Sequence, residues 1–196
     1  MPPTIVYLHG LNSAPASIKA RALGAAIAKL PADGRPEYFI PQLHHRPAEA
    51  VRAVEGWLDS RSRTALAFIG SSLGGFYATY FAERREARAI LINPSVRPHA
   101  DLERYLGPQR NVYTGETYEL TREHFDELRR FRIGRITRPE RYFLLTQSGD
   151  EVLDWREAVD YFGGALQFLY GGGDHAFQDF DAQIPAILRF ASEVPA

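Results

Sequence analysis

A G-x-S-x-G pattern occupies residues 70–74, near the middle of the chain. An apolar run precedes it and a helical pattern follows, so the pattern lies at a predicted strand-to-helix turn. Such a turn presents the central serine hydroxyl at the end of a sheet, and glycines two residues before and after the serine avoid steric collisions. Ser71 would need a glycine at position 69, which is isoleucine. We therefore predict Ser72 to be a nucleophile.

A serine nucleophile needs a base within hydrogen-bond reach and a carboxylate that orients this base. Asp150 follows the predicted strand 141–146, and His175 lies in the glycine-rich loop after the predicted strand 165–170. Both residues are expected at the carboxyl ends of strands, as Ser72 is, and they follow the order serine, acid, histidine. Glu151 and Asp154 are alternatives to Asp150, but Asp154 has the position of a helix N-cap. The pattern predicts acyl transfer.

Acyl transfer also needs backbone N–H groups that stabilise a developing oxyanion. Leu73, directly after the nucleophile, is expected to supply one donor. Leu11 is expected to supply the other, because Gly10 before it allows a close backbone approach after the first strand. His9 precedes Ser72 and is expected to support this loop, with a catalytic role as the weaker alternative.

Two further sequence patterns are of a kind found in metal or phosphate sites, but we expect neither ligand here. His44 and His45 are adjacent, so their side chains should point apart, and no metal-ligand spacing accompanies them. The run Gly171–Gly173 lacks the lysine and the glycine spacing of phosphate-binding loops. Asp174, next to His175, is expected to cap the last helix or to support its loop. The sequence therefore predicts no metal and no cofactor.

Short apolar runs alternate with helical patterns along the chain, which is typical of βαβ units and a parallel sheet. We expect a three-layer α/β/α sandwich with a mostly or fully parallel six-stranded sheet. Strands are expected at 4–8, 37–40, 64–69, 87–92, 141–146 and 165–170. Helices are expected at 17–29, 47–60, 73–84, 154–161 and 177–191.

One interval, 92–141, breaks this alternation and contains no convincing strand. We expect residues 1–196 to form one domain with a small cap-like insertion around 97–139. Arginines at 129–138 are balanced by Glu123, Asp126 and Glu127 on the same segment, which favours a solvated helix face over a nucleic-acid site. Four aromatic residues of the insertion could line a pocket, although packing is the more common role: Tyr105, Tyr113, Tyr118 and Phe125.

Composition narrows the classes of function. The chain has 196 residues, 45% of them hydrophobic, which suits one globular domain. A net charge of −1 gives no field that attracts nucleic acid or anionic membranes. The absence of cysteine excludes disulfides and thiolate catalysis. No secretion signal or membrane span is visible, so we expect a cytoplasmic protein that acts on a small molecule.

The chain resembles the α/β-hydrolase superfamily, and more closely the small YqiA-like esterases of bacteria. The resemblance rests on motifs at 8–13, 70–75, 93–94, 113–116, 149–153 and 173–177. It implies a reduced α/β-hydrolase fold without an N-terminal hairpin and hydrolysis of esters or thioesters without a cofactor. It also implies that Ser72 is the nucleophile, Asp150 the acid and His175 the base.

Two other functions remain open at this stage. A protein with this fold can bind ligands without catalysis. The same three residues can also act on amides, lactones or peroxide-forming acids, because one nucleophile and one oxyanion hole serve each reaction.

Overall fold

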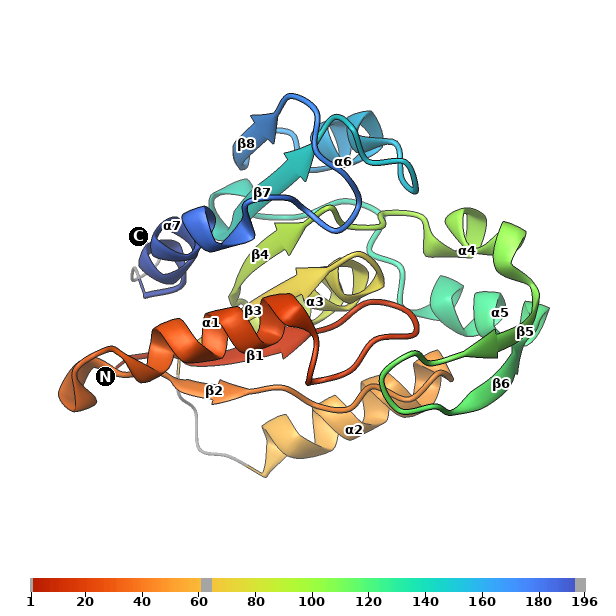
Figure 1. Cartoon of the computed structure of the whole chain (residues 1–196), viewed down its shortest axis with the longest axis horizontal. Helices are drawn as coiled ribbons and strands as arrows, with labels where there is room; N and C mark the ends of the chain where they lie inside the picture. The colour runs from red at the N-terminus through yellow and green to blue at the C-terminus, as the bar shows by residue number, and fades with distance from the viewer. Residues whose placement is uncertain (1, 61–64, 193–196) are drawn as a thin grey trace.

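The structure is a computed structural model that describes residues 2–60 and 65–192. Within these residues a six-stranded sheet is enclosed between two layers of helices (Figure 1). Every neighbouring pair of strands is parallel, in the order β2-β1-β3-β4-β7-β8. The strands are β1 (Thr4–Leu8), β2 (Glu37–Phe39), β3 (Leu66–Ser71), β4 (Arg88–Ile92), β7 (Tyr142–Gln147) and β8 (Leu166–Tyr170). This confirms the predicted fold class. Thr64, the first residue of the predicted third strand, lies outside the described residues.

The helices form two layers, one on each face of the sheet. Helices α1 (Ile18–Ala28) and α7 (Phe180–Ser192) cover one face, and α2 (Pro47–Asp59), α3 (Leu73–Arg85) and α6 (Trp155–Tyr161) cover the other. Side chains of β1 alternate between them: Ile5 and Tyr7 pack with α1 and α7, while Val6 and Leu8 pack with α2 and α3. Burial on both faces explains why the central strands are continuously apolar.

The chain reverses its direction across the sheet at β1. From β1 it moves outward to β2, and it then returns past β1 to build β3 and β4 on the other side. The segments that leave the carboxyl ends of β1 and β3 therefore diverge to opposite faces. This is the place where open parallel sheets form their binding sites.

The last helix begins later than the sequence pattern indicates. We predicted a helix over 177–191, but α7 begins at Phe180. Phe177 and Asp179 have φ angles of 66° and 57°, in the left-handed region that a right-handed helix cannot contain. None of the helices in the described ranges is long and apolar enough to cross a membrane.

The segment between β4 and β7 contains two strands that the sequence analysis did not predict. They are β5 (Gly107–Arg110) and β6 (Thr117–Leu120), an antiparallel hairpin. Each strand has only four residues. The sequence of β5, Gly-Pro-Gln-Arg, shows no apolar alternation, and the alternation in β6, Thr-Tyr-Glu-Leu, has the shortest length that can indicate a strand. The segment also contains α4 (Pro98–Asp101), η2 (Glu103–Tyr105), α5 (Arg122–Arg130) and η3 (Pro139–Arg141), and the short turn η1 (Ala32–Gly34) precedes β2.

Candidate active site

Three predicted residues from distant parts of the chain form one hydrogen-bonded line. The Ser72 Oγ lies 2.9 Å from the His175 Nε2. The His175 Nδ1 lies 2.8 Å and 3.0 Å from the two carboxylate oxygens of Asp150. Because a carboxylate only accepts, Nδ1 carries the hydrogen and Nε2 is free to accept from the serine hydroxyl. The arrangement is that of a nucleophile, a base and an orienting acid.

Ser72 occupies a strained turn between β3 and α3. Its φ and ψ angles are 55° and −123°, a region that residues other than glycine rarely adopt. The turn is possible because backbone segments touch where side chains are missing. A Cβ on Gly70 would lie 2.2 Å from the Gly74 carbonyl oxygen, and one on Gly74 would lie 1.9 Å from the Leu8 carbonyl oxygen. Both glycines are thus required for the predicted strand-to-helix turn.

The structure brings Asp150, and neither of its rivals, to the histidine side chain. The Asp150 side chain is only 1% exposed, and its Oδ1 accepts hydrogen bonds from the backbone N–H groups of Val152 and Leu153. Glu151 instead accepts from the backbone N–H of His175, at 2.9 Å. Asp154 caps α6, as expected, by accepting from the Arg156 N–H.

Two residues to which the sequence analysis assigned no role in the site hold the histidine loop. The Asn93 amide donates to the carbonyl oxygens of Asp174 and His175, at 2.9 Å and 3.2 Å. The Gln147 side-chain oxygen accepts from the N–H groups of Asp174 and Gln178. Asp174 also accepts from the Gln178 side chain, so it supports the loop and does not cap α7. Asn93 and Gln147 stand at the carboxyl ends of buried strands, a position that could have indicated them.

The loop after β1 passes directly beside the serine. A Cβ on Gly10 would lie 3.2 Å from the Ser72 Cβ, so glycine permits this close approach. His9 supports the loop: its Nδ1 donates to the Gly10 carbonyl at 3.0 Å, and its Nε2 accepts from the Leu43 N–H at 3.1 Å. Burial lowers the pKa of His9 below its usual value, which favours the neutral imidazole. A neutral imidazole has one donor nitrogen and one acceptor nitrogen, as these two bonds require. Leu11 follows as the predicted oxyanion donor.

An open cavity of about 560 Å³ lies in front of Ser72 and His175. Apolar side chains from several elements line it: Tyr7, Leu11, Ile18, Tyr113, Phe177 and Phe180. Ile18 is 80% exposed at its rim, and Tyr113 reaches it from the turn between β5 and β6. Lys19 adds one cation, whose ammonium donates to the Ala176 carbonyl at 2.7 Å. Burial lowers the pKa of Lys19.

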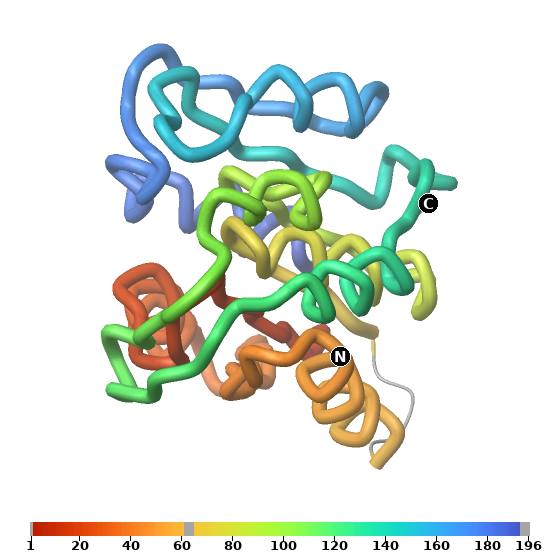
Figure 2. The backbone as a smooth tube through the Cα atoms, turned by 90° about the vertical axis from the view of Figure 1, so that its right-hand side faces the viewer, coloured from red at the N-terminus to blue at the C-terminus, as the bar shows by residue number. Residues whose placement is uncertain are grey.

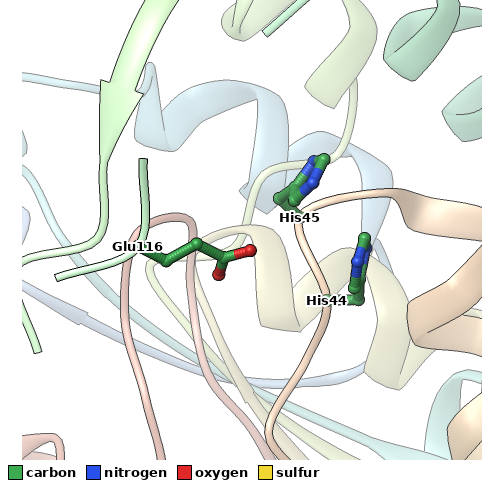
Figure 3. A group of neighbouring side chains, drawn as sticks. All are labelled: His44, His45 and Glu116. Atoms are coloured by element: carbon green, nitrogen blue, oxygen red, sulfur yellow. The ribbon is translucent and has the colours of Figure 1, made fainter. Parts of the chain in front are cut away.

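A second group of titratable side chains lies near the oxyanion loop. His44, His45 and Glu116 each offer a possible ligand atom, and these atoms lie within 4.8 Å of one another. Figure 3 shows the Glu116 carboxylate pointing toward the segment that carries the two histidines. The expectation that the adjacent imidazoles point apart was wrong: their ring centroids are 4.3 Å apart. Residues 43–46 are not a regular strand, so neighbouring side chains need not alternate.

Hydrogen bonds nevertheless give these imidazoles the wrong tautomers for a metal at this site. The His44 Nδ1 accepts from the Arg46 N–H, which leaves the hydrogen of a neutral ring on Nε2. The His124 Nδ1 accepts from the Thr121 N–H, so its Nε2 donates to the His45 Nδ1 at 3.1 Å. His45 then also carries its hydrogen on Nε2. Because a metal needs a nitrogen lone pair, the three side chains do not fit a metal ion without rearrangement.

A family model described as "Uncharacterised protein family (UPF0227)" matches residues 4–192. The chain belongs to this family. Its match extends from the first residue of β1 to the last residue of α7, so it includes every element that carries a candidate site residue.

Comparison with solved structures shows that this chain has the α/β-hydrolase fold. A protein from Agrobacterium vitis S4 is 21% identical over 97% of this chain and 88% of its own, with a TM-score of 0.78. The mouse alpha/beta hydrolase domain-containing protein 10 is 18% identical over 95% and 87%, with a TM-score of 0.68. Est1E from Butyrivibrio proteoclasticus, with ferulic acid bound, is 12% identical over 96% and 87%, with a TM-score of 0.69.

Proposed function

We propose that the protein is a serine hydrolase that cleaves carboxylic esters or thioesters through an acyl-enzyme intermediate. One observation carries this proposal: the line from Ser72 Oγ to His175 Nε2, at 2.9 Å, and from His175 Nδ1 to Asp150, at 2.8 Å. Side chains separated by 103 and 25 residues meet in the order that nucleophilic catalysis requires. The fold shared with an α/β-hydrolase domain protein and an esterase adds support.

In the first half of the proposed reaction, the Ser72 oxygen attacks the acyl carbonyl carbon and His175 takes the hydroxyl proton. The carbonyl oxygen becomes an oxyanion, which the N–H groups of Leu11 and Leu73 would stabilise. As the intermediate collapses, the bond to the leaving group breaks and His175 returns its proton to the departing alcohol or thiol. The acyl group remains on Ser72.

In the second half, a water molecule attacks the acyl-enzyme, and His175 accepts a proton from this water. A second oxyanion forms and collapses, and the proton passes to the Ser72 oxygen as the carboxylic acid leaves. Asp150 keeps the imidazole in one orientation and stabilises the imidazolium that forms in each half. Its own carboxylate is held by the N–H groups of Val152 and Leu153, at 2.9 Å and 2.8 Å.

The cavity supports a small-molecule substrate with an apolar acyl or aromatic part. Its lining includes the aromatic side chains of Tyr7, Phe177 and Phe180 beside polar and charged ones, with Tyr113 and Ile18 at the rim. Tyr113 belongs to the 97–139 insertion, which would therefore shape the pocket as a small cap. The structural neighbour Est1E is described with ferulic acid, an aromatic carboxylic acid, bound. The proposed reaction needs no cofactor, metal or nucleic acid.

Hydrolysis of p-nitrophenyl acetate, butyrate, octanoate and palmitate tests this proposal. We expect turnover by the wild type and a loss of about 10⁴-fold or more in Ser72→Ala, with the fold retained by circular dichroism. A fluorophosphonate should label the wild type and the matched control Ser71→Ala, but not Ser72→Ala. Turnover that survives in Ser72→Ala contradicts the proposal.

The same experiment distinguishes the other two functions. Labelling of Ser72 without ester hydrolysis indicates an intact nucleophile that acts on another acyl class, such as amides or lactones. Absence of both labelling and hydrolysis in folded protein indicates a protein that binds ligands without catalysis.

A further inference from the structure

The β5–β6 hairpin lies beside the loop that follows β1, as both views of the backbone show (Figures 1 and 2). Asn12 of this loop joins the two strands of the hairpin. Its side-chain nitrogen donates to the Gln109 Oε1 of β5 at 2.9 Å, and its side-chain oxygen accepts from the Tyr118 hydroxyl of β6 at 2.9 Å. The donor and the acceptor of the Asn12 side-chain amide thus each bind a different strand of the hairpin.

Each partner of Asn12 is held in place by a further contact. The Gln109 Nε2 donates to the Tyr105 carbonyl at 2.7 Å, which directs the Gln109 oxygen toward Asn12. The Tyr118 ring stacks on His45, with ring centroids 4.3 Å apart and an angle of 14° between the planes. The hairpin therefore presents a fixed acceptor and a fixed donor to the loop.

Ser13, the next residue of the loop, is bonded to the same hairpin. The buried Asn111 donates from its side-chain nitrogen to the Ser13 carbonyl at 2.9 Å. Its side-chain oxygen accepts from the N–H groups of Tyr113 and Thr114, within the turn of the hairpin. The loop is therefore bonded to the hairpin at two successive residues.

Leu11, the proposed oxyanion donor, lies between two anchored points. On one side, His9 holds the Gly10 carbonyl. This carbonyl belongs to the same peptide unit as the Leu11 N–H, and the two groups point in opposite directions in a trans peptide. On the other side, Asn12 has a φ of 54°, a left-handed conformation that asparagine tolerates better than most residues. The Asn12 conformation sets how the chain leaves Leu11.

We propose that Asn12 is a positioning residue for the oxyanion hole and that the β5–β6 hairpin is a brace for this loop. The inference rests on the proposed function, because it assigns the Leu11 N–H to the oxyanion. Asparagine meets both requirements of the position: it adopts the left-handed conformation, and it offers one donor and one acceptor. Glycine meets only the first requirement.

Two variants weaken the brace and leave the proposed triad intact. Asn12→Gly keeps the left-handed backbone and loses both side-chain bonds, while Tyr118→Phe keeps the stacked ring and loses one bond. Glu86→Gly is the matched control for the first, because Glu86 is an exposed residue with a φ of 53° at the end of α3. Tyr161→Phe is the control for the second, because the Tyr161 hydroxyl donates to the Ile133 carbonyl elsewhere in the molecule.

Steady-state kinetics and inhibition by butylboronic acid give two readouts. The boronic acid forms a tetrahedral adduct when the Ser72 oxygen donates an electron pair to boron, so its affinity depends on the oxyanion donors. We expect Asn12→Gly to lower kcat by about 10- to 100-fold with little change in KM, and to weaken boronate binding by a similar factor. Tyr118→Phe should show a smaller effect in the same direction. Both controls should match the wild type.

Unchanged kcat and boronate affinity in Asn12→Gly overturn the proposal, as does a fall in kcat with unchanged boronate affinity. If the wild type neither hydrolyses an ester nor binds the boronate, the proposed function fails and hydrogen exchange decides the brace. Asn12→Gly should then accelerate amide exchange at 11–13, while Glu86→Gly should not. Equal exchange in the wild type and Asn12→Gly contradicts the brace.

Discussion

The side-chain amide of Asn93 holds the backbone carbonyl of His175, 3.2 Å away and 82 residues later in the chain. The same nitrogen donates to the Asp174 carbonyl at 2.9 Å, and the Asn93 oxygen accepts from the Gln147 N–H at 3.0 Å. Asn93 is 2% exposed and has a φ of 40°. One buried side chain, directly after β4, therefore connects the last residue of β7 with the loop that follows β8.

Replacing Asn93 should affect both stability and activity. Asn93→Ala loses three hydrogen bonds and leaves buried partners unsatisfied, so we expect the free energy of unfolding to fall by about 2 to 3 kcal/mol. We also expect kcat to fall, because the His175 loop loses its support. Asn93→Asp keeps the acceptor but places a carboxylate against two carbonyl oxygens, so it should be at least as harmful. Urea denaturation and ester kinetics measure both effects; a fully active, stable Asn93→Asp contradicts the expectation.

The strained backbone of Ser72 predicts a difference between two inactive variants. Ser72→Gly and Ser72→Ala both lack the hydroxyl, but only glycine adopts a φ of 55° and a ψ of −123° without strain. We expect the free energy of unfolding of Ser72→Gly to exceed that of Ser72→Ala by about 1 kcal/mol. This difference is what remains after the entropy cost of glycine is subtracted from the strain that glycine relieves. Chemical denaturation of the two proteins measures the difference. Equal stability would mean that the turn stores no strain.

The buried His9 predicts a loss of stability in acid. Burial lowers its pKa below the usual 6.5, so the unfolded chain binds a proton more readily than the folded protein does. The free energy of unfolding should therefore fall as the pH drops below about 6.5, and the contribution should level off below the folded pKa. Protonation would also break the bond from the Leu43 N–H.

Denaturation between about pH 8 and pH 5 measures this dependence. His9→Gln removes the titrating group, so its stability should depend less steeply on pH than that of the wild type, whatever its stability at neutral pH. An identical slope in the two proteins would show that His9 does not contribute.

The tautomers of His44 and His45 are unsuited to metal binding, so we predict that a metal chelator leaves stability and activity unchanged. His44 and His45 each use Nδ1 as a hydrogen-bond acceptor and carry their hydrogen on Nε2, so zinc could bind only after bonds to Arg46 and His124 break. We expect dialysis against EDTA to leave the melting temperature and ester turnover unchanged, and zinc titration to give no saturable heat. Stoichiometric zinc binding that disappears in Glu116→Gln contradicts this expectation.

The alternating strand and helix patterns were sufficient to predict the parallel sheet and the helices on both faces. A strand that is buried on both faces is itself rich in apolar residues, so each strand can be recognised from its local sequence. The G-x-S-x-G pattern, Asp150 and His175 could be placed for a similar reason. The carboxyl ends of parallel strands meet at one edge, so a residue that follows any such strand belongs to that edge.

Only the tertiary structure decided the contacts between loops. The two strands of the β5–β6 hairpin have four residues each, too few for a clear apolar pattern, and Asn12 meets Gln109 across 97 residues of sequence. The contacts of Asn93 with His175 and of His45 with His124 span 82 and 79 residues. Such polar contacts depend on the direction of single side chains and on loop conformations such as the positive φ of Asn12. The sequence was therefore sufficient to predict the residues that we propose to react, while the tertiary structure decided which other residues hold them in position.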